Sequence, residues 1–65
     1  MKIGENLKKF RKESGFSQQQ VAEILKVDQS NISRWERDLS RPDYENLVAL
    51  AKLYEVSVSD ILDVD

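Results

Sequence analysis

The sequence predicts an all-α domain, and three observations favour this fold class. Apolar residues recur at intervals of three and four along nearly the whole chain, as they do on one face of a helix. Residue types that begin helices stand in front of most of these segments. Strand signals are nearly absent, because the alternating stretch VSVSDIL is short and starts with a helix-capping pattern. With 65 residues, the chain is expected to form a single compact domain spanning 1–65.

Five helical segments can be delimited from their ends. The first is expected to stop at Gly15, in the left-handed conformation that ends many helices. The others begin at Ser17, Asp28, Asp43 and Ser57, residue types whose side chains accept a bond from the first helical turn. Ser17 and Ser57 also start capping-box patterns. The apolar residues that these segments carry are Ile3, Leu7, Phe10, Val21, Ala22, Leu25, Ile32, Trp35, Tyr44, Leu47, Val48, Leu50, Ala51, Tyr54, Val58, Ile61 and Leu62.

The connection between the second and third segments is very short. Only about KVD, residues 26–28, separates them, so we expect a sharp crossing of the two helices rather than an antiparallel pair. Ala22 supplies a small side chain where the two backbones approach. The spacing of Trp35 from Ile32 places the indole in the core.

The charged residues are distributed unevenly, although the net charge is only −2. Residues 1–41 hold nine Lys/Arg and six Asp/Glu, a net +3, whereas residues 42–65 hold one and six, a net −5. A basic front can meet a polyanion while an acidic back faces away. Two ordinary solvated surfaces are the alternative explanation of this distribution.

The composition excludes several classes of function. The chain has no Cys and no His, which rules out disulfides and the usual zinc ligands. It has no glycine-rich phosphate loop either, so we expect no enzyme, no cofactor, no metal and no small-molecule ligand. No apolar run is long enough to cross a membrane and no signal peptide opens the chain. The absence of Cys fits a cytoplasmic protein, which is the location we expect.

The most specific stretch is SQQQVAEILKVDQSNISRWE, residues 17–36. Through it, and through nearly all of residues 3–62, the chain resembles the phage repressor/Cro-like (XRE-like) helix-turn-helix family. The resemblance implies a compact five-helix repressor-like domain with the helix-turn-helix at helices 2 and 3. It also implies binding of double-stranded DNA, commonly by a homodimer on a near-palindromic operator. We therefore expect a sequence-specific transcriptional regulator, in particular a repressor, with helix 3 in the major groove.

The outward side of helix 3 carries residue types suited to reading base edges. Gln29 can bond both edge atoms of adenine, and Arg34 can bond both acceptors of guanine. Ser30 and Ser33 are short enough to let the backbone approach the bases. All four match the family's base-reading positions. The alternatives are that Ser30 helps Asp28 to cap the helix and that Ser33 is simply a small exposed residue.

Further residues match positions at which the family contacts the DNA backbone. They are Gln18, Asn31, Arg37, Ser40 and Arg41. Gln18 begins the second helix, where exposed N–H groups favour an anion in any case. The start of the fourth helix, at Asp43 and Tyr44, offers another N–H group to phosphate. For Arg37 and Arg41, a solvated surface charge is the alternative.

The resemblance also concerns structural positions. It implies that Arg11 and Glu36 form a partly buried ion pair that braces helix 3 and does not read DNA. Lys26 and Asp38 stand where the family often has Gly, and a left-handed Lys26 costs about 1 kcal/mol relative to Gly. Asp38 places a negative charge near the proposed phosphate surface, where we expect it to weaken binding.

A protein-interaction module is the main competing function, because some family members act as antitoxins that bind a toxin as well as DNA. Polar bidentate side chains on helix 3 favour DNA, whereas exposed Leu, Phe and Met would favour a protein groove. Helices 4 and 5 and the C-terminus carry more apolar residues than one small core needs, which predicts a weak homodimer through this region. These residues include Tyr54, Val56, Val58 and Val64.

Overall fold

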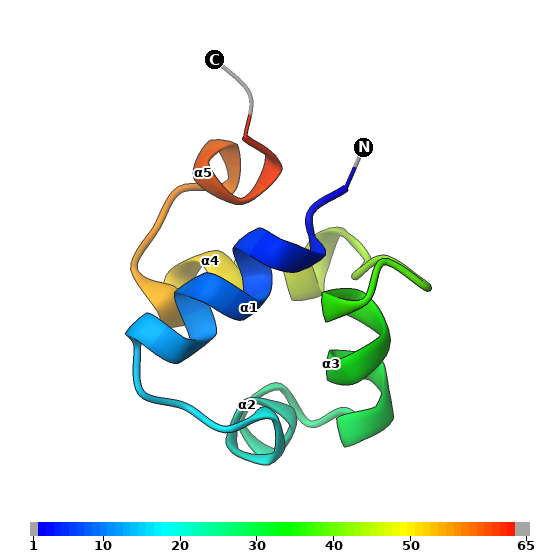
Figure 1. Cartoon of the computed structure of the whole chain (residues 1–65). Coiled ribbons are helices and arrows are strands. Elements are labelled where there is room, and N and C mark those ends of the chain that lie inside the picture. Colours follow the sequence, from blue (N-terminus) through cyan, green and yellow to red (C-terminus); the bar gives the residue numbers. More distant parts are fainter. Residues whose placement is uncertain (1, 64–65) are drawn as a thin grey trace.

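The computed structural model describes residues 2–63, and these residues form five α-helices. The helices are α1 (Gly4–Glu13), α2 (Gln18–Leu25), α3 (Gln29–Glu36), α4 (Tyr44–Tyr54) and α5 (Val58–Leu62). Figure 1 shows α1 crossing the middle of the molecule, with α2 below it, α3 to its right and α5 above it. Residues 2–63 contain no strand, so the predicted all-α class is confirmed.

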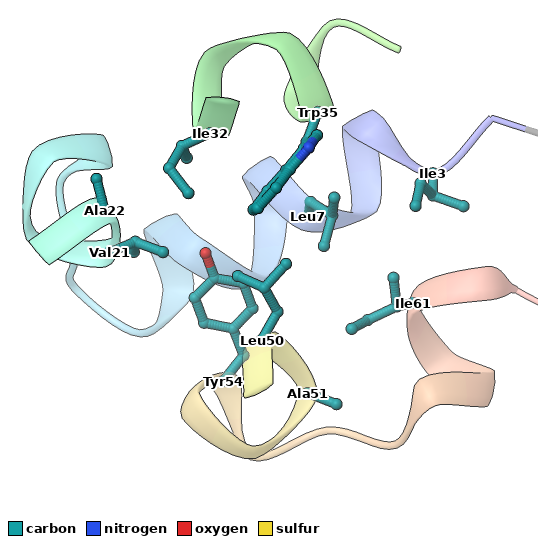
Figure 2. Packing of buried hydrophobic residues seen from close by; sticks show 10 residues of the cluster. All are labelled: Ile3, Leu7, Val21, Ala22, Ile32, Trp35, Leu50, Ala51, Tyr54 and Ile61. Atoms are coloured by element: carbon teal, nitrogen blue, oxygen red, sulfur yellow. The ribbon is translucent and has the colours of Figure 1, made fainter. Parts of the chain in front are cut away.

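Side chains from all five helices meet in one hydrophobic core (Figure 2). The buried residues are Ile3, Leu7, Val21, Ala22, Ile32, Trp35, Leu50, Ala51, Tyr54 and Ile61. The predicted inward position of Trp35 is confirmed, since only 6% of its surface is exposed. Full burial of a large apolar side chain stabilises a fold by about 1.5–3 kcal/mol, so this core is the main force that holds the helices together.

The starts of four helices follow the local signals in the sequence, with one difference. The Ser17 and Ser57 capping boxes both form, and Asp43 Oδ1 accepts a bond from the Asn46 N–H at 3.0 Å. Asp28 occupies the predicted N-cap position of α3, but its side chain accepts no capping hydrogen bond. The expected capping bond from Asp28 is therefore wrong, although the helix begins where predicted.

Helices α1 to α4 end in the same way, with one residue in the left-handed conformation. These residues are Gly15, Lys26, Asp38 and Glu55, with φ angles of 81°, 60°, 59° and 55°. In each case the next N–H group bonds a carbonyl five residues back, as Val27 N does to Ala22 O at 3.0 Å. Only one of the four residues is a glycine, so the other three endings carry a steric cost of about 1 kcal/mol each.

The helix-turn-helix consists of α2, a tight turn and α3. Figure 1 shows α2 nearly end-on and α3 along its length, so the two axes cross steeply. The pair shares the most extensive contact between helices in the described part of the chain, and Ala22 of α2 is buried. The left-handed Lys26 makes this short turn possible.

The expected surplus of apolar residues in helices 4 and 5 is smaller than predicted. Tyr54 is a core residue with 5% of its surface exposed, so its expected place on a dimer surface is wrong. Val56 and Val58 are half-buried and pack against the core. Val64 lies outside the described residues.

Candidate nucleic-acid interface

Helix α3 separates its side chains into a buried and an exposed side. Ile32, Trp35 and Glu36 are buried, because they face the core and α1. The opposite side carries the polar residues singled out in the sequence. Gln29, Ser30, Arg34 and Arg37 are exposed, whereas Asn31 and Ser33 are half-buried. Positions 29, 30, 33, 34 and 37 recur at three- and four-residue spacing, so they form one continuous strip along the helix.

Most polar groups on this strip are not engaged elsewhere in the protein. Within residues 2–63, the side chains of Gln29, Ser30 and Arg34 make no hydrogen bond to the protein. Arg37 differs, since its Nε donates to the backbone carbonyl of Ser33 at 3.3 Å. This bond holds the guanidinium group of Arg37 against the helix. The Gln29 amide and the Arg34 guanidinium therefore keep their bidentate bonding capacity for a ligand.

A buried ion pair ties α3 to α1. Arg11 Nε donates to Glu36 Oε2 at 2.6 Å, and Arg11 Nη2 donates to Glu36 Oε1 at 3.1 Å. Arg11 Nη1 also donates to the Phe16 carbonyl at 2.9 Å, so each guanidinium nitrogen has a partner. The hydrogen bond to Glu36 raises the pKa of Arg11 above its usual value, although burial opposes this effect. The structure thus brings Arg11 and Glu36 together as a brace for α3.

Gln18 joins this network from the first turn of α2. Its Nε2 donates to Glu36 Oε1 at 3.0 Å. An ionised carboxylate can only accept, so this bond determines which end of the Gln18 amide faces Glu36. The second N–H of the same nitrogen stays available beside the N-terminus of α2, where helical N–H groups favour an anion.

A further connection lies at the C-terminal end of α3. Asp38 Oδ1 accepts bonds from the Ile3 and Gly4 N–H groups, both at 3.0 Å. Gly4 lies directly against α3, and a Cβ on it would overlap the backbone carbonyl of Glu36. The sequence predicted the left-handed conformation of Asp38, but the only role it indicated for the side chain was a negative charge near phosphate. Its carboxylate instead accepts bonds from two N–H groups at the start of α1.

The connection between α3 and α4 carries the remaining predicted contacts. Ser40 is half-buried and Arg41 is exposed. Leu39 and Tyr44 also lie open, with 62% and 79% of their surfaces exposed. Asp43 caps the Asn46 N–H, so α4 begins directly after this connection. Ser40 and Arg41 therefore follow the α3 strip along the chain and precede the start of α4.

Two features of this region are absent from the sequence prediction. The first is the pair of hydrogen bonds that Asp38 Oδ1 accepts from the Ile3 and Gly4 N–H groups, which joins residues more than 30 positions apart. The second is Tyr54, whose buried hydroxyl has no hydrogen-bond partner within residues 2–63. Burial, with a smaller contribution from the nearby Glu36 charge, raises the pKa of Tyr54 above its ordinary value. An aromatic residue at helical spacing signals core but does not reveal an unpaired hydroxyl.

Two searches of the described residues were negative. Across residues 2–63, no group of three or more acidic side chains is placed to hold a metal ion. Within the same range, no helix combines the length and the apolar character that a membrane crossing requires.

Comparison with known proteins identifies similar chains. Residues 7–61 match a protein-family model described as helix-turn-helix. The chain is 38% identical over 65 residues to the HTH-type transcriptional regulator ImmR of Bacillus subtilis (strain 168), covering 100% of this chain and 51% of ImmR. It is also 38% identical over 60 residues to the HTH-type transcriptional regulator DicA of Escherichia coli (strain K12), covering 92% of this chain and 44% of DicA.

A third relative has a name that specifies activation. The chain is 32% identical over 62 residues to the HTH-type transcriptional activator BcrR of Enterococcus faecalis, covering 95% of this chain and 30% of BcrR. The chain therefore spans about half the length of the first two relatives and less of the third.

Proposed function

The chain belongs to the helix-turn-helix family, and we propose that it is a sequence-specific regulator of transcription that binds double-stranded DNA. In this proposal α3 enters the major groove of a near-palindromic operator, and the protein acts as a repressor in the cytoplasm. Gln29, Ser30, Ser33 and Arg34 read base edges. Gln18, Asn31, Arg37, Ser40 and Arg41 bind phosphates. No cofactor is needed for this function.

One observation carries the proposal. A helix with a buried apolar side presents a strip of polar groups, and the Gln29 and Arg34 side chains on it make no hydrogen bond within residues 2–63. Because these long polar side chains make no hydrogen bond within residues 2–63, they add nothing to the stability of the fold in that way. Amide and guanidinium groups on a helix are, however, the groups that make bidentate contacts to adenine and guanine edges. The brace from α1 supports the same proposal, because base reading requires a helix held in a fixed orientation.

Selection from a pool of random duplex DNA is the primary test. We expect the wild-type chain to enrich a short sequence and its inverted repeat. The recovered duplex should bind with a strong salt dependence despite the net charge of −2. If about four phosphates are neutralised per subunit, a plot of the logarithm of the binding constant of a dimer against the logarithm of the salt concentration has a slope of roughly −7. A pool without enrichment, or a flat salt response, would contradict the proposal.

Assembly as a homodimer is the second part of the proposal. One subunit reads only a few base pairs, which is too few for useful specificity in a genome. We place a weak interface on helices 4 and 5 and the C-terminus, where the half-buried Val56 and Val58 remain after Tyr54 is assigned to the core. Analytical ultracentrifugation with and without the recovered duplex is the measurement. One subunit per duplex at saturation would rule the dimer out.

The sign of regulation needs its own test, because one relative is named as an activator. A reporter gene placed behind the recovered duplex should be less active when the chain is expressed. An increase in reporter activity would contradict repression and leave DNA binding intact.

A second candidate function is capture of a protein partner. The exposed Leu39 and Tyr44 favour it, since apolar side chains of this size are costly to leave in water. Neither residue lies on the α3 strip, which offers polar groups instead. A selection that returns no DNA sequence would make this candidate the better one.

A further inference from the structure

The N-terminus of α1 lacks a cap of its own. Its N-cap residue is Ile3, and an isoleucine side chain has no acceptor atom for the first N–H groups of a helix. Asp38, which follows the C-terminal end of α3, supplies the missing acceptor. Its Oδ1 lies 3.0 Å from the Ile3 nitrogen and 3.0 Å from the Gly4 nitrogen, so one oxygen satisfies two donors.

The backbones meet at the same place. A Cβ on Gly4 would overlap the Glu36 carbonyl and lie 2.8 Å from Asp38 Oδ2. The C-terminal turn of α3 therefore touches α1 at its first residue. Glu36 holds α1 at a second point, Arg11, seven residues further along the helix or about 10 Å away. Together with the core packing of Ile32 and Trp35, two separated attachments restrain the angle at which α3 crosses α1 more tightly than one attachment would.

This angle matters most at the far end of α3. Gln29 lies seven residues before Glu36, the attachment that remains without Asp38, and this is about 10 Å along the helix axis. A tilt of about 5° around the remaining attachment would move the start of α3 by about 1 Å. Binding groups need to be held to about 0.5 Å of their productive geometry. A small loss of angular restraint is thus enough to spoil the alignment of side chains with base edges.

We propose that Asp38 is a positioning residue for DNA reading, which fixes the angle of α3 by capping α1 without itself touching DNA. This inference rests on the proposed function. It reverses the simple electrostatic expectation that removing an acid near the DNA surface strengthens binding. The left-handed φ of 59° allows a clean test, because glycine is the residue best suited to that conformation. Asp38→Gly removes the cap and also relieves the backbone cost, and these two effects are of similar size.

The experiment compares wild type, Asp38→Gly, Asp38→Asn and the control Glu45→Gln. Glu45 is an exposed acid in the first turn of α4. Its variant therefore removes one negative charge, as the Asp38 variants do, but leaves the bonds between Asp38 and the start of α1 in place. Each chain is titrated with the duplex recovered by wild-type selection and with a scrambled duplex of equal composition. Circular dichroism melting is recorded alongside.

We expect Asp38→Gly to bind the selected duplex about 10-fold more weakly, which is within the range for one misaligned base contact. Its affinity for the scrambled duplex and its melting temperature should stay near those of wild type. Asp38→Asn should restore selective binding to within about twofold, because the amide oxygen can accept the same two N–H bonds. Glu45→Gln should bind at least as tightly as wild type.

Three results would overturn the inference, and a fourth would overturn the proposed function. If Asp38→Gly binds the selected duplex as tightly as Glu45→Gln does, Asp38 acts only as a charge. If Asp38→Gly is unfolded at the titration temperature, Asp38 serves folding and not positioning. A wild-type chain that binds both duplexes equally would instead overturn the proposed function itself. Selective binding by wild type and an equally selective Asp38→Gly would overturn this inference alone.

Discussion

Arg11 and Glu36 lie 25 residues apart in the chain, and their buried side chains meet with Arg11 Nε 2.6 Å from Glu36 Oε2. Each residue has 8% of its surface exposed. Two charges at this depth are costly to remove from water, and the cost is offset only while both are present with their hydrogen bonds. The pair links α1 to the last residue of α3 and also receives Gln18 from α2.

Glu36→Ala should therefore destabilise the fold strongly. It leaves the Arg11 guanidinium buried without its carboxylate. Removing one partner of a buried ion pair lowers the free energy of unfolding by about 3–5 kcal/mol. Glu23→Ala is the matched control, because Glu23 is exposed and accepts a 3.4 Å bond from Gln19 on the same helix. Its loss should stay within about 0.5 kcal/mol. Equal unfolding free energies of the two variants in urea would show that the ion pair does not brace the fold.

Substitutions at the left-handed helix endings should stabilise the fold, whereas Glu36→Ala should destabilise it. Lys26 and Glu55 hold φ angles of 60° and 55° after α2 and α4, where a glycine would have no steric cost. Lys26→Gly and Glu55→Gly should each raise the free energy of unfolding by up to about 1 kcal/mol. Lys52→Gly, inside α4, should lower it by about 1 kcal/mol. Thermal melts decide the question, and a loss of stability in both ending variants would show that their side chains contribute more than the strain costs.

The buried Tyr54 hydroxyl predicts an alkaline effect. Its pKa is raised above the ordinary value of 10.0 in the folded chain, chiefly by burial. Above about pH 10 the unfolded chain loses this proton while the folded chain keeps it, so stability falls as pH rises, by up to about 1.4 kcal/mol per pH unit. Tyr54→Phe should remove this part of the loss. It should also leave stability at pH 7 unchanged or higher, because the hydroxyl has no hydrogen-bond partner among residues 2–63.

Tyr44→Phe is the control for the alkaline effect, since the Tyr44 ring is exposed to water. Urea unfolding at several pH values between 8 and about 11 compares the two variants with wild type. Parallel stability curves for wild type and Tyr54→Phe would mean that burial does not hold the Tyr54 proton.

Local signals in the sequence predicted most of the fold. The capping boxes of Ser17 and Ser57 and the cap of Asp43 involve residues three positions apart, and all three form. Such patterns are readable because both partners lie within one helical turn. The core position of Trp35 follows from helical spacing in the same way.

Other features depend on contacts between distant residues. The cap that Asp38 provides to α1 requires the folded approach of α3 to Gly4, which no local pattern reveals. Tyr54 fits a core and a dimer surface equally well by spacing, and only packing distinguishes them. Within the candidate site, the exposed strip was predictable from α3 alone, but the bond from Gln18 to Glu36 was not.

The most direct test of base reading by α3 compares Arg34 with Arg41, which carry the same charge. Arg34 lies on the exposed side of α3, and Arg41 lies between α3 and α4. Both alanine variants are titrated with the selected duplex and with a panel of its single-base changes. We expect Arg34→Ala to lose about 1–3 kcal/mol on the selected duplex and much less on a duplex altered at the base that Arg34 reads. Arg41→Ala should weaken all duplexes about equally and reduce the salt slope by roughly one. If Arg34→Ala weakens every duplex by the same factor, Arg34 contacts only phosphate, and base reading through this residue is contradicted.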